Sequence, residues 1–291
     1  MAPALGTFGV WGGQLRFGDP GEIAEAAAEL EQLGYGALWF PGGAGGDVFG
    51  AARHLLSATE RVTVATGILN LWAHDPDEVA AEHARLTADH PDRFLLGIGI
   101  SHSLLVERLN QSYERPLART AAYLDRLDEA SPPVPRAERA LAALGPKMLR
   151  LAAERTAGAH PYLVPPEHTA VARATLGAGP LLAPEQKVVL ERDPARARAT
   201  ARASLAMYLQ LPNYTNNLLR TGFTPEDLAD GGSDRLVDGI VAWGDDTTIA
   251  ARVQDHLDAG ADHVCVQVLQ AEGLPLPAWR ELAPALGGLR A

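Results

Sequence analysis

The sequence predicts an α/β fold, a (β/α)8 TIM barrel, on three observations. Apolar, β-branched runs alternate with segments of helical periodicity along the 291 residues, which indicates a parallel sheet covered by helices. Glycine ends a helix before an apolar strand at residues 33–36, 157–160 and 259–262. No G-x-G-x-x-G fingerprint follows the first strand, which disfavours an open dinucleotide-binding sheet.

The first half of the chain carries the clearest signals for individual elements. Strands are predicted at residues 5–11, 35–40, 62–69 and 94–100, and helices at residues 19–33, 47–59 and 75–90. Asp19 and Asp75 are predicted N-caps, because each carboxylate precedes a proline and then a helical pattern. Local sequence signals alone therefore predict an alternation of strands and helices in this half of the chain.

The same alternation continues more faintly in the second half. Strands are predicted at residues 139–144, 160–164, 188–191 and 262–269, and helices at residues 145–156, 166–176, 193–209 and 276–286. Residues 210–243 do not fit a minimal barrel, and they are predicted as an insertion between the seventh helix and the eighth strand. The insertion either covers the barrel mouth or is a peripheral elaboration. Residues 1–291 are predicted to form a single barrel domain with this insertion.

Composition limits the partners and the compartment. The chain has 36 acidic and 25 basic residues, a net charge of −11, which argues against a nucleic-acid or anionic-membrane surface. Its one cysteine, Cys265, excludes an internal disulfide framework and a multi-thiolate metal site. No apolar run approaches the ~18 residues of a membrane span, and no signal peptide is visible. We therefore expect a cytoplasmic protein with a small-molecule substrate.

One candidate anion site follows the predicted fifth strand. The segment Leu144-Gly145-Pro146-Lys147-Met148 opens a helix directly where that strand ends, which is the functional end of such a barrel. Free N–H groups, the helix dipole and the Lys147 ammonium all favour an anion there. The alternative is a proline-started helix with a solvated lysine.

Two histidines are candidates for proton transfer or ligand contact. His102 ends the predicted fourth strand, where an imidazole can act as an acid or a base near neutral pH. His74 lies beside Asp75 and either contacts a ligand or only flanks a helix cap. His160, on the predicted sixth strand, is expected to be packed. A structural role for His102 remains the alternative.

Two other barrel chemistries receive little support. A metal-dependent hydrolase would need a His-x-His pair on the first strand or an H-E-x-x-H motif, and neither occurs, so no metal is expected. A Schiff-base aldolase would need a strand-borne lysine at the mouth. Lys187 is predicted near the start of the seventh strand, at the opposite end of the barrel.

Several segments carry a family resemblance along the whole chain. They are residues 64–70, 94–99, 145–149, 183–187 and 212–214. On these segments the chain resembles the bacterial luciferase-like monooxygenase superfamily of flavin and deazaflavin enzymes. Within that superfamily it is similar to the branch of F-420-dependent oxidoreductases. The resemblance implies an insertion-bearing (β/α)8 barrel that binds the deazaflavin coenzyme F-420 at its mouth.

The resemblance also implies roles for individual residues. A bulge that ends the third strand, often with a non-proline cis peptide, supports the deazaflavin ring and maps to Gly67, Ile68 and Leu69, with Asn70 at the ring edge. The coenzyme phosphate maps to Leu144, Gly145, Lys147 and Met148. Trp11, His74 and Tyr214 are expected in the substrate pocket, and His102 is the expected catalytic residue. A homodimer is expected.

The second loop departs from the family pattern. Sugar-phosphate dehydrogenases of the family place an acid and a histidine after strand two, whereas this chain has Pro41-Gly42-Gly43. Sugar-phosphate oxidation is therefore not expected. The predicted function is hydride transfer between F-420 and a small organic substrate. An FMN-dependent luciferase-like monooxygenase and a non-catalytic ligand-binding barrel remain the alternatives.

Overall fold

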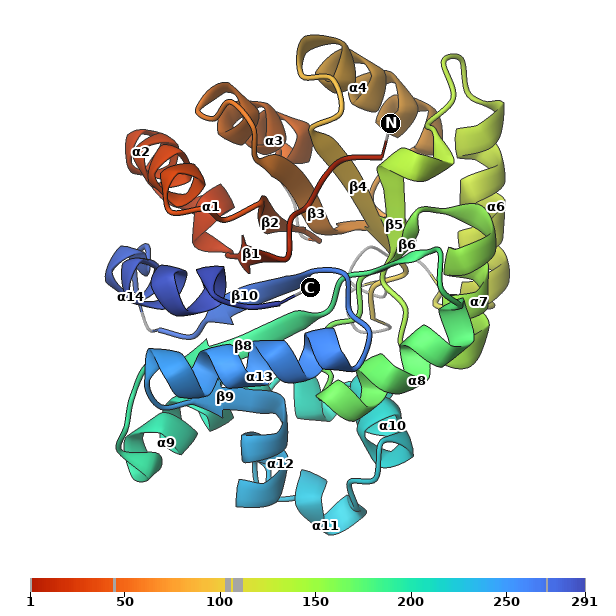
Figure 1. Ribbon diagram of the computed structural model, residues 1–291. Helices are drawn as coiled ribbons and strands as arrows, with labels where there is room; N and C mark the ends of the chain where they lie inside the picture. Colours follow the sequence, from red (N-terminus) through yellow and green to blue (C-terminus); the bar gives the residue numbers. More distant parts are fainter. Residues whose placement is uncertain (1, 44–45, 103–105, 107–111, 271, 291) are drawn as a thin grey trace.

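The computed structural model confirms the predicted α/β barrel (Figure 1). It describes residues 2–43, 46–102, 106, 112–270 and 272–290. The described residues contain one sheet of ten strands, in the order β7-β6-β5-β4-β3-β2-β1-β10-β8-β9, and all of its neighbouring strands are parallel. The strands are β1 (Phe8–Trp11), β2 (Ala37–Gly42), β3 (Thr63–Asn70), β4 (Phe94–Gly99), β5 (Arg139–Leu141), β6 (Gly158–Ala159), β7 (Leu181–Leu182), β8 (Glu185–Val189), β9 (Val241–Trp243) and β10 (Val264–Val268).

The sheet closes on itself through the extended segment that contains β7 and β8. On one side of this segment, the Ala183 N–H donates to the Ala159 carbonyl, with an N···O distance of 2.9 Å. On the other side, the Cys265 N–H donates to the Pro184 carbonyl at 3.1 Å. Pro184 itself has no N–H to donate, which accounts for the break between β7 and β8. Strand β9 pairs only with the second half of β8.

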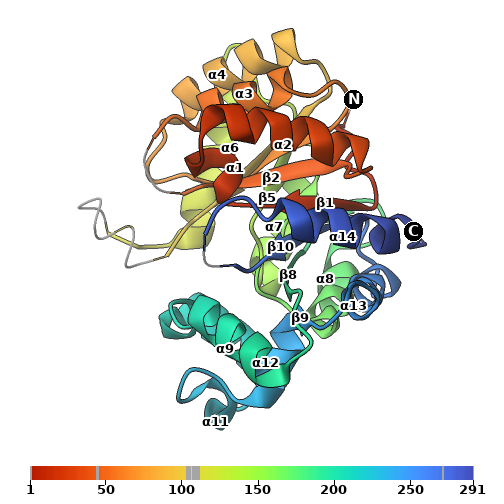
Figure 2. The same ribbon diagram turned by 90° about the vertical axis from the view of Figure 1, so that its left-hand side faces the viewer.

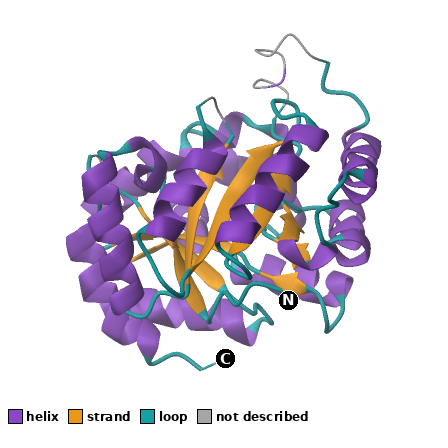
Figure 3. Cartoon of the chain, turned by 90° about the horizontal axis from the view of Figure 1, so that it is seen from above, coloured by secondary structure: helices purple, strands orange, loops and turns teal. Residues whose placement is uncertain are grey.

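Helices surround the strands on the outside of the barrel (Figure 1 and Figure 3). They are α2 (Pro20–Gln32), α3 (Val48–Ser57), α4 (Pro76–Asp89), α6 (Pro116–Glu129), α7 (Pro146–Arg155), α8 (Pro166–Leu176), α13 (Asp246–Asp258) and α14 (Leu276–Gly287). The carboxylates of Asp19 and Asp75 accept backbone N–H groups at the starts of α2 and α4, as predicted. Helix α13 (Asp246–Asp258), whose end at residues 259–262 was predicted but whose bounds were not, lies between α8 and α14.

The predicted seventh helix and the predicted insertion together form a group of short elements beside the barrel (Figure 2). Between β8 and α13 lie α9 (Pro194–Leu205), η2 (Tyr208–Gln210), α10 (Pro212–Arg220), α11 (Pro225–Leu228), α12 (Asp234–Ile240) and β9. These elements share a small apolar core that includes Leu205, Tyr214 and Leu236. Because the same core includes Leu163 and Val189, the group is packed against the barrel.

Two strands of the second half are displaced from their predicted positions. The sixth is predicted at residues 160–164 but forms at Gly158–Ala159, because Pro161 cannot donate to a ladder. The seventh is predicted at residues 188–191, whereas β7 and β8 cover residues 181–189. Three consecutive polar residues, Glu185, Gln186 and Lys187, obscure the strand pattern, although all three are buried.

The barrel strands are buried on both faces. Trp39, Ala65, Leu95 and Cys265 point into the barrel and form the interior cluster. Their neighbours along the strands, such as Leu38, pack outward under the helices. Two-sided burial explains why these strands are nearly continuous apolar runs. None of the helices in the described part of the chain is long and apolar enough to cross a membrane.

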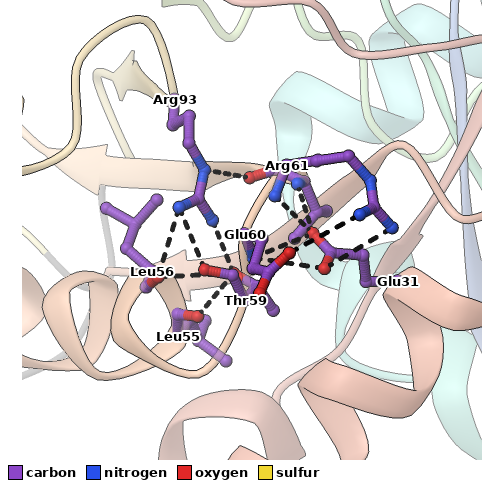
Figure 4. A network of polar contacts seen from close by, with 8 residues as sticks. Glu31, Leu55, Leu56, Thr59, Glu60, Arg61 and Arg93 are labelled. Atoms are coloured by element: carbon purple, nitrogen blue, oxygen red, sulfur yellow. Dashed lines mark hydrogen bonds and ion pairs between the residues drawn. The ribbon is translucent and has the colours of Figure 1, made fainter.

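Glu31 of α2 fixes the start of β3 at the end of the barrel opposite the mouth (Figure 4). Its Oε1 accepts the N–H of Val62 at 2.8 Å and that of Glu60 at 3.1 Å. Burial alone would raise the pKa of the Glu31 carboxyl, but these backbone N–H groups and Arg61 hold it below its usual range. Arg93 donates to the Thr59 carbonyl at 3.0 Å, which ties the same turn to β4.

Candidate active site

Strand β3 ends in a bulge at the barrel mouth, at the predicted place. The Gly67–Ile68 peptide bond is cis, and the pairing of β3 with β4 shifts register between Ala65 and Leu69. The Trp11 indole N–H donates to the Gly67 carbonyl at 3.2 Å. A Cβ atom on Gly67 would lie 2.4 Å from Trp11 Nε1, so this position requires glycine. Trp11 is thereby held against the bulge.

The other bulge residues differ in what they present to the mouth. Ile68 is half-buried, whereas Leu69 and Asn70 are buried. Asn70 Oδ1 accepts the Trp72 N–H at 3.1 Å, and its Nδ2 donates to the Gly43 carbonyl at 3.5 Å. The Asn70 amide therefore fastens the loops after β2 and β3. Gly67 and Ile68 are the bulge positions that a ligand in the mouth would meet.

His102 lies after β4, against the insertion. Its ring centroid is 5.2 Å from that of Tyr214 in α10, and Asn213 hydrogen-bonds its side chain. Its Nδ1 is buried and has no partner among the described residues. Burial lowers the pKa of His102, and the bond to Asn213 opposes that shift only in part. The ring is therefore neutral near neutral pH.

An aromatic row links the predicted residues Trp11, Tyr214 and His102. Tyr162, which follows β6, is the link, with ring centroids 5.5 Å from Trp11 and 6.2 Å from Tyr214. Tyr208 of η2 adds a second hydroxyl, 3.0 Å from the Tyr162 hydroxyl. Tyr208 and Tyr214, from η2 and α10, therefore pack against the Tyr162 ring after β6. Helices α11 and α12 lie to the side (Figure 2).

A buried polar cluster lies beneath this aromatic row. Lys187 Nζ donates to the Tyr162 hydroxyl at 2.6 Å, to Gln267 Oε1 at 2.8 Å and to Glu185 Oε1 at 3.1 Å. The Lys187 and Glu185 side chains are fully buried. The prediction that Lys187 lies at the start of its strand is wrong, because Lys187 pairs with Gln267 in the middle of β8. Its side chain points into the barrel, toward the mouth.

The predicted phosphate cradle lies at the start of α7. Gly145 is the N-cap and has no side chain to satisfy the first N–H groups of the helix. Lys147 is exposed and Met148 is half-buried, while the Leu144 carbonyl accepts a hydrogen bond from His168 at 2.9 Å. The Arg220 guanidinium from α10 lies 3.9 Å from the position of a Cβ on Gly145.

His74 lies after β3, beside the glycine-rich second loop. Its side chain is half-buried and hydrogen-bonds the Gly42 backbone. Burial lowers the pKa of His74, and the Arg16 guanidinium adds to that shift. Arg16 also donates to the Pro41 carbonyl at 2.8 Å. His74 is thus part of the loop packing and does not join the Tyr214 cluster in any contact of the described residues.

A model of the luciferase-like monooxygenase family matches residues 4–263. The chain belongs to this family. The sequence resemblance is therefore confirmed, and membership in an oxidoreductase family confirms the expectation of an enzyme. A protein of Mycobacterium tuberculosis, whose name assigns it provisionally to the coenzyme F420-dependent oxidoreductases, is 34% identical over 120 residues. That match spans 40% of this chain and 33% of the relative.

Solved structures of this luciferase-like fold include both deazaflavin and flavin enzymes. An F420-dependent secondary alcohol dehydrogenase, in complex with an F420-acetone adduct, has a TM-score of 0.76 at 13% identity and covers 97% of this chain and 99% of its own. The F420-dependent tetrahydromethanopterin reductase of Methanopyrus kandleri has a TM-score of 0.71 at 16% identity over 98% of both chains. An FMN-bound type II Baeyer–Villiger monooxygenase of Pseudomonas putida has a TM-score of 0.70 at 13% identity over 100% of this chain and 99% of its own.

Several residues of this luciferase-like site were not predicted from the sequence. They are Tyr162, Tyr208, Glu185, Lys187, Arg220 and Gln267. Tyr162 and Gln267 are 105 positions apart, and Lys187 and Gln267 are 80 apart, so only barrel closure brings them together. One signal was available, because the chain has only two lysines, Lys147 at the start of α7 and Lys187 inside the barrel.

Proposed function

We propose that this chain binds coenzyme F420 and catalyses hydride transfer between it and a small organic substrate, with His102 as the catalytic acid or base. The observation that carries the proposal is the position of His102. It is a titratable ring at the end of a barrel strand, and its buried Nδ1 has no partner among the described residues. A buried ring nitrogen that makes no hydrogen bond is costly unless a ligand completes it.

The residues at the mouth fit a phosphate-bearing tricyclic coenzyme. The first N–H groups of α7, with Lys147 and Arg220, would hold the phosphate, since a helix N-terminus and two cations favour an anion. The half-exposed Gly67 and Ile68 would support the ring. When bound, F420 supplies the hydride chemistry, and the protein supplies position and proton transfer.

The lowered pKa of His102 indicates how it would act. A neutral imidazole accepts the hydroxyl proton of an alcohol as that alcohol is oxidised, and it returns the proton in the reverse direction. Alcohol–ketone pairs are therefore the first substrates to test. The bound F420-acetone adduct of the structurally similar alcohol dehydrogenase supports the same choice.

A flavin monooxygenase is the second candidate. The FMN-bound Baeyer–Villiger enzyme shares the fold, and the α7 anion site would suit the FMN phosphate as well. The curated relative supports F420 over FMN.

We also propose a homodimer, which light scattering of the purified protein would test.

Fluorescence titration of the purified protein with F420, FMN and FAD tests the coenzyme. We expect saturable binding of F420, with weaker binding of FMN and FAD. Reduced F420 is then mixed with a panel of ketones, aldehydes and enones, and oxidised F420 with the matching alcohols. Tight FMN binding with oxygen consumption would replace the proposal by the monooxygenase. Binding of none of the three coenzymes would overturn both.

A further inference from the structure

The side-chain amide oxygen of Gln267 is held by two donors inside the barrel. The Tyr162 hydroxyl and Lys187 Nζ each lie 2.8 Å from Gln267 Oε1, and they lie 2.6 Å from one another. The three side chains come from β10, from the segment after β6 and from β8. One sp² oxygen thus receives two hydrogen bonds at normal donor–acceptor distances.

Gln267 stands between these donors and a pocket. With Trp11 and Leu274 it lines a pocket of about 420 Å³ at the ends of β1 and β10. Gln267 is half-buried, whereas Lys187 is fully buried behind it. A rotation of the Gln267 side chain would therefore present both donors to a molecule in the pocket.

The charge of the cluster favours a neutral ligand oxygen. Glu185 balances the Lys187 ammonium at 3.1 Å, so the pair carries no net charge when both are ionised. Burial of two charges is expensive, and an apolar pair of similar size would stabilise a barrel interior as well or better. Burial also raises the pKa of Tyr162, so its phenol remains a donor.

We propose that the Tyr162 hydroxyl and the Lys187 ammonium form a binding site for the carbonyl oxygen of the substrate, and that Gln267 Oε1 occupies this site until a ligand displaces it. This inference rests on the proposed function for the reaction that follows binding. It adds the substrate class, which is neutral aldehydes, ketones or enones. The pocket has polar lining residues in Gln14 and Glu22, and its apolar ones, Trp11, Phe17 and Leu274, suit the hydrocarbon part of such a molecule. The same two donors would stabilise negative charge that develops on the oxygen during reduction.

The test uses a carbonyl probe and no coenzyme. The probe is 4-dimethylaminocinnamaldehyde, whose visible absorption moves to longer wavelength when its carbonyl oxygen accepts hydrogen bonds. We expect a saturable shift with the wild-type protein. Tyr162→Phe should reduce the shift, because Lys187 alone would remain as a donor, and should weaken binding by up to roughly tenfold, as expected for one lost hydrogen bond.

A second variant predicts a change in the opposite direction. Gln267→Ala removes the competing oxygen, so it should keep the spectral shift and bind the probe at least as tightly as the wild type. Tyr35→Phe is the matched control, because Tyr35 is also a buried tyrosine whose hydroxyl donates, here to the Trp279 carbonyl at 2.9 Å. Tyr35 packs in the core outside the barrel and does not line the pocket. It should bind the probe like the wild type.

Three results would overturn the site. They are the absence of a saturable shift in the wild type, an unchanged shift in Tyr162→Phe, and loss of the shift in Gln267→Ala with the fold intact by circular dichroism. A covalent adduct after borohydride treatment would also overturn it, since Lys187 would then act as an amine. Titration of the same samples with F420 separates the two proposals, because probe binding without F420 binding would refute the proposed function alone.

Discussion

The indole N–H of Trp39 donates to Nε2 of His263 at 3.1 Å, inside the barrel. This bond requires a lone pair on Nε2, so the His263 proton is on Nδ1, which lies 2.9 Å from the Gly6 carbonyl. The ring is fully buried, and burial lowers the pKa of His263 to about 4. If Nε2 were protonated, its N–H would face the Trp39 indole N–H, and neither group could accept a hydrogen bond from the other.

We predict that stability falls as the pH drops from ~6.5 toward ~4, because buried histidines stay neutral while unfolded ones take up protons. Burial lowers the pKa to about 4 in His83, His160 and His263 and to about 3 in His256. Each folded-state pKa lies below the unfolded value, so stability is fully present above the unfolded pKa and is lost below it. Each group should contribute ~1–2 kcal/mol of loss between pH ~7 and pH ~5. Urea unfolding at the two pH values measures this.

Replacing one buried histidine tests whether these histidines cause the loss of stability at low pH. His263→Gln should be less stable at pH ~7 but should lose less stability toward pH ~5 than the wild type does. His54→Asn is the control, since His54 is a partly exposed residue on α3 whose Nε2 contacts the Pro20 carbonyl. A free energy of unfolding that does not change over this range would contradict the prediction.

Glu31→Gln should destabilise the fold by ~1–3 kcal/mol, because the carboxylate accepts several backbone N–H groups at the start of β3. The pKa of Glu31 is lowered in the folded state, so its contribution is present above the unfolded pKa and is lost as the pH falls through the folded pKa. Denaturant midpoints measured at neutral and acidic pH test both statements.

Glu25→Gln is the matched control for Glu31, since Glu25 lies on the exposed face of the same helix α2. It should change the free energy of unfolding by less than ~0.5 kcal/mol. Equal effects of the two substitutions would mean that the Glu31 network contributes little.

The fold was predictable because its signals are local. Asp19 and Asp75 mark helix starts, and the strands buried on both faces stand out as apolar runs. Strand β9 has no such signal, since its three residues are held by pairing with β8, far away in the sequence. Buried polar residues such as Lys187 conceal β8, because their partners come from other strands.

The candidate site was predictable only in part, for the same reason. Gly67 and the start of α7 belong to continuous segments, and the resemblance identified both. The contacts of Tyr162 with Lys187 and Gln267 depend on closure of the barrel. Arg220 reaches Gly145 from α10, whose approach to the start of α7 no local pattern predicts.

The anion site gives a prediction for coenzyme binding. Lys147→Ala and Arg220→Ala should each weaken binding of F420 by ~1.5–3 kcal/mol, because each removes a charged partner of the phosphate. Both side chains lie at the start of α7, so the double variant should lose less than the sum if they share one phosphate. Fluorescence titration gives the dissociation constants.

Arg150→Ala is the control for these variants, because Arg150 is exposed on the same helix, away from its N-terminus. It should bind F420 like the wild type. Unchanged affinity in Lys147→Ala and Arg220→Ala together would place the phosphate elsewhere in the mouth.

His102→Ala should keep F420 binding and lower turnover by roughly 10²–10⁴-fold, the usual contribution of a positioned acid or base. The variant removes the only imidazole ring that contacts Tyr214 in the described part of the chain. In the wild type, burial lowers the pKa of His102, so alcohol oxidation should remain active to a lower pH than an ordinary histidine would allow. That pH dependence should disappear in the variant. Single-turnover mixing is required, so that slow product release does not conceal the chemical step.

The outcome separates three roles for His102. His90→Ala, at the C-terminal end of α4, controls for loss of a histidine outside the mouth and should react at the wild-type rate. A wild-type rate in His102→Ala would mean that water or the Tyr162 hydroxyl supplies the proton. Loss of the folded state in His102→Ala would identify a packing role, since the ring is half-buried against Tyr214. In that case His102→Asn, which keeps a polar group of similar size, measures the rate in a folded protein.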